Sequence, residues 1–231
     1  MKLRHAFWRT IACVAATTVL ASAVPAPIAA ASVGLYPGME IDFAGGGRCS
    51  LGFIATNDDG TRLGVTAGHC SDFLGQHVAS HNGNPIGTVV SRAGDDVDSY
   101  HFGITLIQLD PATYVQDAFF TSFRSPRVSE PVRKYGERTE GTNGRVTSVH
   151  YDDDPTHSVM RSTVVILPGD SGSPWYRSSD GGPVLFGISI GNSTRRDDDA
   201  YLGGFGFPIN SLIRYVRNES SFGHGFTPVG P

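Results

Sequence analysis

The sequence predicts an all-β protein, because short apolar segments alternate with turn-forming residues along most of the chain. The 231 residues include 29 Gly and 14 Pro, and strand-like segments recur about every ten residues, a spacing typical of β-barrels. The first segment with a useful apolar helical period begins at Ile209. We therefore expect a β-barrel protein with one core system that ends in a helix.

The first half, which we place at about residues 40–120, contains four strand candidates, and a histidine follows the second of them. They are 51–56, 62–66, 86–91 and 104–109. Asp59-Gly60 lies between the first two and is a strong hairpin signal. The second strand should therefore deliver His69 just past its end.

The second half, at about residues 130–217, contains five more strand candidates and the helix. The strands are 130–135, 144–150, 158–167, 183–190 and 203–208, and 121–129 is the expected crossover between the halves. Apolar residues then recur at helical spacing, with Asn210 or Ser211 able to cap the start, at Ile209, Leu212, Ile213 and Val216. We expect the tail, 220–231, to be loosely ordered.

Residues 1–31 have the features of an export signal. Lys2, Arg4 and Arg9 form a positive leader, 11–24 form an apolar core, and Ala-rich sites at 21–23 and 29–31 suit a signal peptidase. We expect cleavage near Ala31 and a secreted domain of residues 32–231. The apolar run is shorter than the roughly 20 residues that a membrane span needs. No membrane association is therefore expected after cleavage, a retained N-terminal anchor being the alternative.

The charge of the exported chain argues against several kinds of partner. Three cations leave with the signal, so 15 of the 18 Lys and Arg residues remain against 22 Asp and Glu residues, a net charge of about −7. Such an acidic chain is not expected to bind nucleic acid or an anionic membrane surface.

Two cysteines, Cys49 and Cys70, remain after Cys13 leaves with the signal. In an oxidising compartment this pair is expected to form a disulfide, and closing a loop of about 22 residues contributes about 3 kcal/mol. The disulfide would also anchor His69. A metal site is the weaker interpretation, because no second Cys or His pair lies at ligand spacing. The Asp triplets at 152–154 and 197–199 are interpreted as solvated loops rather than calcium sites, so we expect no metal and no cofactor.

The most informative segment is Pro-Gly-Asp-Ser-Gly-Ser-Pro at 168–174. Glycines on both sides of a serine allow a tight turn that exposes the Ser171 hydroxyl, and the amides of Gly169 and Ser171 can then stabilise an oxyanion. A serine nucleophile needs an adjacent base, which His69 in the segment 66–70 can supply. Each motif alone also fits an ordinary turn or a structural histidine, whereas the combination predicts nucleophilic catalysis.

In this combination the chain resembles the chymotrypsin-like serine proteases, most closely the bacterial streptogrisin and α-lytic protease branch. Segments 47–53 and 66–70 are similar to the first barrel of that branch, and 168–172 is similar to its nucleophile loop. The resemblance covers most of residues 40–217. It implies two six-stranded antiparallel β-barrels of the trypsin-like kind, a C-terminal helix, and a peptide or protein substrate in the cleft between the barrels. The long pro-segment of that branch is not expected here.

The third catalytic residue of the family is an Asp that begins a strand, and 101–109 is the corresponding stretch here. Alignment on either end of this stretch puts His101 or Gly103, not a carboxylate, at that position. The nearest carboxylates precede the strand: Asp95, Asp96 and Asp98. We predict that a bulge brings Asp98 to His69; His101 as the orienting residue, or no working third residue, are the alternatives.

The resemblance also implies roles for residues around the nucleophile. Asp170 is expected to be buried and paired with a cation from 132–141, where the candidates are Arg133, Lys134 and Arg138. The segment 187–191 resembles the strand that pairs with an extended substrate, which makes Ser189, Ile190 and Gly191 predicted substrate contacts. Val165 aligns with the floor of the specificity pocket, and an apolar floor favours apolar side chains over Lys or Arg.

The sequence therefore predicts a secreted, monomeric serine endopeptidase that forms an acyl-enzyme on Ser171, with His69 as general base. Two alternatives remain at this point. One is a chymotrypsin-like binding module with weakened catalysis, favoured by the missing strand-start Asp, and the other is an esterase that uses the same serine.

Overall fold

The N-terminal half of the protein is an eight-stranded antiparallel sheet. The computed structural model describes residues 32–229, so the predicted signal, 1–31, lies outside the described residues. In order across the sheet, the strands are β17 (Thr227–Pro228), β4 (Phe53–Thr56), β5 (Arg62–Ala67), β8 (Ile104–Leu109), β7 (Pro85–Arg92), β6 (His77–Ser80), β2 (Glu40–Phe43) and β3 (Arg48–Ser50). The predicted Asp59-Gly60 turn joins β4 to β5, with Gly60 at a φ of 73°, a backbone angle that favours glycine.

The C-terminal half is a closed six-stranded barrel with one added edge strand. The strand order is β10 (Ser122–Phe123), β15 (Val184–Thr194), β14 (Pro174–Arg177), β11 (Pro131–Gly136), β12 (Glu140–His150), β13 (Val159–Ser162) and β16 (Tyr201–Pro208). Because β16 also pairs with β15, the six strands from β15 to β16 close on themselves. Outside both sheets, β1 (Val33–Leu35) pairs in parallel with β9 (Thr113–Val115).

The all-β architecture with a C-terminal helix is confirmed, but the N-terminal half differs in one respect from the expected second closed barrel. Across residues 32–229, no strand ladder joins the two ends of the N-terminal sheet. Two backbone hydrogen bonds at the bend between β3 and β4 extend neighbouring ladders: the Gly52 N–H donates to the Val65 carbonyl at 2.8 Å beside β4 and β5, and the Leu51 N–H donates to the Met39 carbonyl at 2.8 Å beside β2 and β3. This half is therefore a half-barrel.

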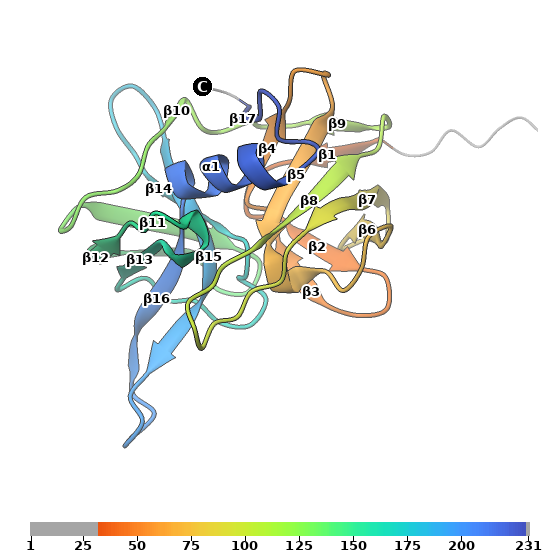
Figure 1. Cartoon of the computed structure of the whole chain (residues 1–231). Coiled ribbons are helices and arrows are strands. Elements are labelled where there is room, and N and C mark those ends of the chain that lie inside the picture. Colours follow the sequence, from red (N-terminus) through yellow and green to blue (C-terminus); the bar gives the residue numbers. More distant parts are fainter. Residues whose placement is uncertain (1–31, 230–231) are drawn as a thin grey trace, which may run out of the picture. The chain divides into compact units, whose positions relative to one another are not determined.

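Helix α1 (Ile209–Glu219) packs where the two halves meet, and its four predicted apolar residues are buried. Figure 1 shows β11, β12 and β13 on one side of this helix and β4, β5 and β8 on the other. The expected cap is wrong, because the helix begins at Ile209, directly after Pro208, without a side-chain cap. Asn210 and Ser211 consequently lie inside its first turn. Among the described residues, no helix has the length and apolarity to cross a bilayer.

Two further expectations have clear outcomes. The disulfide between Cys49 and Cys70 is confirmed, with Cα atoms 6.1 Å apart. The tail is more ordered than predicted, because Phe226 is fully buried and β17 adds to the edge of the N-terminal sheet beside β4. The apolar burial of Phe226 and the ladder of β17 fix the chain up to Val229, whose N–H donates to the Ile54 carbonyl at 2.7 Å.

Candidate active site

His69 and Ser171, which lie 102 residues apart in the sequence, meet at the boundary between the two halves. Strand β5 ends at Ala67, and a single 3₁₀ turn, Gly68–Cys70, then carries the histidine. The disulfide holds the end of that turn to β3. The Ser171 Oγ lies 2.7 Å from the His69 Nε2, which is hydrogen-bonding distance. The sequence-based pairing of these two side chains is therefore confirmed as a contact.

The carboxylate that contacts His69 belongs to Asp95, which corrects the prediction of Asp98. The Asp95 Oδ2 lies 2.5 Å from the His69 Nδ1 and accepts a second hydrogen bond from the His69 N–H at 3.0 Å. Its Oδ1 accepts the Gly103 N–H at 2.6 Å, and the Asp95 side chain is completely buried. Asp98 is solvent-exposed, and its N–H donates to the Asp96 side chain instead.

A seven-residue excursion, 96–102, separates Asp95 from the strand that the family pattern would place directly after it. Asp96 and His101 form an isolated antiparallel bridge with backbone bonds of 2.7 and 2.9 Å, so the excursion folds back on itself like a small hairpin. Gly103 follows the excursion and leads directly into β8. His101, the second candidate, makes no hydrogen bond to His69 among the described residues, and its ring lies 5.4 Å from that of His157.

The two amides predicted to bind an oxyanion have no competing acceptor. Among the described residues, the N–H groups of Gly169 and Ser171 make no hydrogen bond to the protein. Gly169 has a φ of 109°, and a Cβ at this position would lie 2.7 Å from the Glu137 Oε2. The positive φ favours glycine at this position, and the two N–H groups remain available to an oxyanion.

Ser50, a residue that the sequence analysis did not single out, holds the nucleophile loop in place. Its N–H donates to the Ser171 carbonyl at 2.8 Å, and its Oγ donates to the Gly169 carbonyl at 3.0 Å. The same Oγ accepts the Glu137 N–H at 2.9 Å. Ser50 is fully buried, so each bond satisfies a group that has no access to water. Its position directly after Cys49 was the available signal, because the disulfide fixes that segment.

Gly172 allows the nucleophile loop to approach the strand that leads to His69. With a φ of 82°, a Cβ on this residue would lie 1.9 Å from the Thr66 Oγ1 and 2.5 Å from the Ser50 carbonyl oxygen. No side chain fits there. The glycine after the nucleophile is therefore required for the two halves to meet.

Asp170 is completely buried, and Lys134 is the cation that pairs with it, at 3.1 Å between Nζ and Oδ1. Lys134 faces inward because buried residues alternate along β11, so its side chain is buried as well. Burial lowers the pKa of the Lys134 ammonium, and the charge and hydrogen bond of Asp170 oppose that shift. The same carboxylate accepts the Arg138 and Thr139 N–H groups at 3.1 Å each. Of the three predicted candidates, Lys134 alone forms the ion pair.

The residues predicted to contact substrate lie along β15 and the segment that precedes the nucleophile. The Ser189 carbonyl accepts the Gly172 N–H at 2.8 Å, and its hydroxyl lies 2.7 Å from that of Ser173 inside the barrel. The ladder slips between Ser189 and Gly191, which leaves Ile190 outside the regular pairing with β16. Val165 is 39% exposed, whereas Ile190 is nearly fully buried.

Two groups of side chains have the proximity needed to hold a metal ion within residues 32–229. Cys49, Cys70 and His69 form the first, but its sulfurs are joined in the disulfide and offer no thiolate. Glu40, Asp42 and His81 form the second, where His81 is hydrogen-bonded to Glu40 at 2.8 Å. Both carboxylates of the second group also pair with Arg48, at 2.8 Å for Glu40 and 3.4 Å for Asp42.

The chain is similar to known proteins in both sequence and fold. No family model matches the chain. Glutamyl endopeptidase 2 of Streptomyces griseus is 32% identical over 164 residues, which are 65% of this chain and 82% of that protein. Serine protease 1 of Streptomyces fradiae is 29% identical over 167 residues, 68% of this chain and 44% of that protein. Among solved structures, Thermobifida fusca protease A is similar with a TM-score of 0.59 at 23% identity, covering 78% of this chain and 94% of that one.

Proposed function

The chain belongs to the chymotrypsin-like serine proteases and is a serine-type endopeptidase, and from this premise we propose that Ser171 is its nucleophile and Asp95, not Asp98, its third catalytic residue. The observation that carries the proposal is the continuous line of hydrogen bonds from Asp95 through His69 to Ser171. In a Ser-His-Asp site the carboxylate fixes the imidazole tautomer and stabilises its charged form. The three hydrogen bonds that Asp95 accepts keep it in place for that role.

The reaction follows from these positions. Ser171 Oγ attacks the substrate carbonyl carbon while His69 Nε2 removes its proton, and the carbonyl oxygen becomes an oxyanion held by the Gly169 and Ser171 N–H groups. The imidazolium then gives its proton to the leaving amine, the C–N bond breaks, and an acyl-enzyme remains on Ser171. A water molecule, deprotonated by His69, attacks the ester and restores the serine hydroxyl.

The acyl half of a substrate would extend along Ile190 and Gly191. The slipped ladder supports this placement, because a residue outside the regular pairing has backbone groups available for an added strand. The exposed side chain of Val165 supports a preference for an apolar residue before the scissile bond. A preference for Glu is the rival, because the similar Streptomyces griseus protein is named a glutamyl endopeptidase.

The proposed site of action is extracellular, with the signal 1–31 removed and residues 32–231 acting as a monomer. The disulfide supports an oxidising compartment, since such bonds do not persist in the reducing cytosol. Sequencing the N-terminus of protein recovered from the culture medium tests cleavage near Ala31, and light scattering tests the monomeric state.

Hydrolysis of a peptide panel tests the catalytic proposal. Purified protein is assayed with peptides that differ only in the residue before the scissile bond: Leu, Phe, Ala, Glu or Lys. Replacement of the nucleophile in Ser171→Ala should lower kcat/KM about 10⁴-fold or more. Ser178→Ala changes an exposed serine whose side chain has no hydrogen bond within residues 32–229, and it should leave kcat/KM unchanged. Equal activity in wild type and Ser171→Ala would end the proposal.

The two alternatives make different predictions in the same experiment. A binding module with weakened catalysis should show no turnover of any peptide. The main reason for this alternative was the missing strand-start Asp, and Asp95 now supplies a carboxylate beside His69. An esterase should turn over ester analogues but none of the matching amides. Amide hydrolysis that depends on Ser171 excludes both.

A further inference from the structure

Three cavities form a track that begins beside the proposed oxyanion hole. The first, of about 490 Å³, is lined by Gly169, Arg138 and Glu137 among others, and we call it the oxyanion-side cavity. The second, the acidic cavity, has about 510 Å³ and shares Glu137 with the first. The third, the aromatic pocket, has about 240 Å³ and shares Tyr36 and Tyr135 with the second. Because each cavity shares lining residues with the next, the three cavities are neighbours.

The aromatic pocket has the composition of a site for an organic cation. Its seven lining residues include four aromatic side chains, two prolines and one carboxylate: Tyr36, Phe119, Tyr135, Tyr176, Pro37, Pro174 and Asp117. Phe119 and Tyr176 stand edge to face with centroids 5.0 Å apart. Aromatic faces attract ammonium and guanidinium groups through their quadrupoles, and Asp117 adds a full negative charge at the rim.

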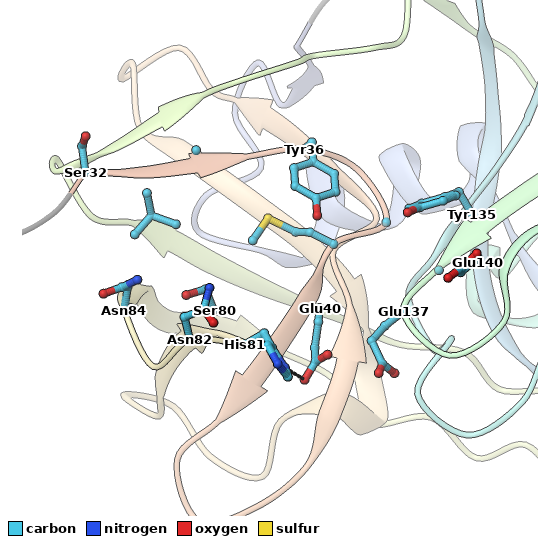
Figure 2. A pocket seen from close by; sticks show the side chains of 15 residues that line it. Ser32, Tyr36, Glu40, Ser80, His81, Asn82, Asn84, Tyr135, Glu137 and Glu140 are labelled. Atoms are coloured by element: carbon cyan, nitrogen blue, oxygen red, sulfur yellow. Dashed lines mark hydrogen bonds and ion pairs between the residues drawn. The ribbon is translucent and has the colours of Figure 1, made fainter.

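The acidic cavity is lined by three carboxylates, Glu40, Glu137 and Glu140, and by no Lys or Arg side chain. Figure 2 shows Tyr135, Glu137 and Glu140 on one side of it, His81 and the turn from Ser80 to Asn84 on the other, and Glu40 between them. Arg48 lies 2.8 Å from Glu40 and 3.6 Å from Glu137, so one guanidinium serves both carboxylates. Burial and the neighbouring charge of Glu40 raise the pKa of the Glu137 carboxyl, the response of a carboxylate whose negative surroundings are not fully compensated.

Two further features fit a binding surface rather than an ordinary solvated face. Neither the acidic cavity nor the aromatic pocket has a Lys or Arg among its lining residues. Ser80, which lines the acidic cavity, is 7% exposed and its hydroxyl has no partner within residues 32–229. Gly38, at a φ of 87°, lies so close to the Tyr135 ring that a Cβ would be 2.5 Å from it, and this contact holds the ring between the two cavities.

We propose that the acidic cavity and the aromatic pocket together bind a segment of polypeptide that carries Lys or Arg side chains. One cationic group would lie against the aromatic faces beside Asp117, and another beside Glu140 and Glu137. Charge complementarity selects this occupant over a proline-rich segment, which the aromatic and proline walls alone would also suit.

The position of the track assigns this segment to the leaving-group side of the substrate, a step that rests on the proposed function. Gly172, after the nucleophile, pairs with Ser189 on the acyl-binding strand, whereas Gly169, before it, lies beside Glu137 at the start of the track. The oxyanion-side cavity is lined by two arginines, Arg48, which pairs with Glu137 at 3.6 Å, and Arg138, for which no ion pair is found within residues 32–229. Basic residues are therefore expected several positions beyond the scissile bond and not directly after it.

Binding is tested first without turnover, in the Ser171→Ala protein. Fluorescence anisotropy is measured with three labelled decapeptides in which Lys, Glu or Pro alternates with Gly. The Lys peptide should bind at least about tenfold more tightly than the other two. Tyr36→Ala with Glu140→Gln should weaken it about tenfold, while the matched pair Tyr151→Ala with Asp153→Asn, an exposed tyrosine and a carboxylate at another acidic loop, should leave it within twofold.

Several results would overturn the proposal. Equal losses in the two double variants would mean that the net negative charge of the protein attracts the peptide without a site. Tightest binding of the Pro peptide would replace the cation with a proline-rich ligand, and the absence of binding would remove the site. All three outcomes are independent of catalysis, so they are distinct from a failure of the proposed function.

The source of the segment is tested by kinetics of the wild-type protein. A cleavable peptide is compared with versions that carry a Lys-Gly extension at either end. The extension on the leaving-group side should lower KM about tenfold with kcat unchanged, and Tyr36→Ala with Glu140→Gln should abolish the gain. An equal gain from the acyl-side extension, or no gain from either, would contradict the assignment to substrate.

Discussion

Replacing Asp95 with Asn changes one carboxylate oxygen into an amide group and leaves the size of the side chain unchanged. Asp95 accepts hydrogen bonds from the His69 ring at 2.5 Å, the His69 N–H at 3.0 Å and the Gly103 N–H at 2.6 Å. An amide has one acceptor oxygen where the carboxylate has two. Its NH₂ group must therefore face at least one of these donors, or the imidazole must adopt the wrong tautomer.

The expected loss is large, because the wrong tautomer cannot take the serine proton. In Ser-His-Asp sites this substitution lowers kcat about 10⁴-fold, which corresponds to about 5 kcal/mol of transition-state stabilisation. We expect Asp95→Asn to lose about 10⁴-fold in kcat with little change in KM. Asp98→Asn is the matched control three residues away, and its kcat should stay within twofold because Asp98 is exposed and outside the site.

The assay is peptide hydrolysis at saturating substrate, with thermal unfolding of each variant measured in parallel. The unfolding curves separate a catalytic loss from a loss of folded protein. An Asp95→Asn protein that is folded and retains more than a tenth of wild-type kcat would refute the reasoning. So would an Asp98→Asn protein that loses as much activity as Asp95→Asn.

Three other substitutions test ion pairs and close contacts of the fold, two of them next to the site. Lys134→Met leaves the buried Asp170 carboxylate without its cation, which should cost about 3–5 kcal/mol of unfolding free energy in urea titrations, and full stability would contradict the pairing. Gly172→Ala should fail to give active protein, as its Cβ would lie 1.9 Å from a β5 side chain; normal activity would mean that the loop sits elsewhere. The hydrogen bond from Arg124 holds the pKa of Glu130 down from 4.5 to about 2. The ionised group therefore favours the folded state above about pH 4.5 and loses this effect as the pH falls toward 2. Glu130→Gln should accordingly lower the free energy of unfolding by about 2 kcal/mol at pH 7 and by nearly nothing at pH 2. A difference that does not change with pH would exclude the ion pair.

The parts of the site that the sequence predicted are those fixed by local backbone chemistry. His69 follows a strand and adjoins a cysteine, and Ser171 lies between glycines that only a tight turn requires, so a few neighbouring residues identify each of them. The disulfide followed from two cysteines in a chain predicted to be exported. These features need no knowledge of distant contacts.

Asp95 was missed because its role depends on a contact that no local pattern encodes. The family pattern places the carboxylate at the start of a strand, and here 96–102 intervene as a folded-back excursion. The burial of the Asp95 side chain comes from tertiary packing, which distinguishes it from the exposed Asp96 and Asp98 only in three dimensions. The bulge hypothesis identified the acidic cluster, but the member in contact with His69 is Asp95 and not Asp98.

Lys134 shows where the sequence held more information than the prediction used. Buried residues alternate along 131–136, so Val132, Lys134 and Gly136 face inward while Arg133 faces solvent. A charged residue at an inward position needs a buried partner, and this argument alone would have selected Lys134 from the three candidates. The order of the tail, in contrast, depends on pairing with β4 across the chain.

The most direct test of the central claim is covalent labelling of the folded protein with a fluorophosphonate, followed by intact-mass and peptide mass spectrometry. The line of hydrogen bonds from Asp95 through His69 to Ser171 predicts one adduct, on Ser171. This adduct should be absent in Ser171→Ala and should form far more slowly in His69→Ala and Asp95→Asn. Folded wild-type protein that takes up no label, or takes it up on another residue, would contradict the account.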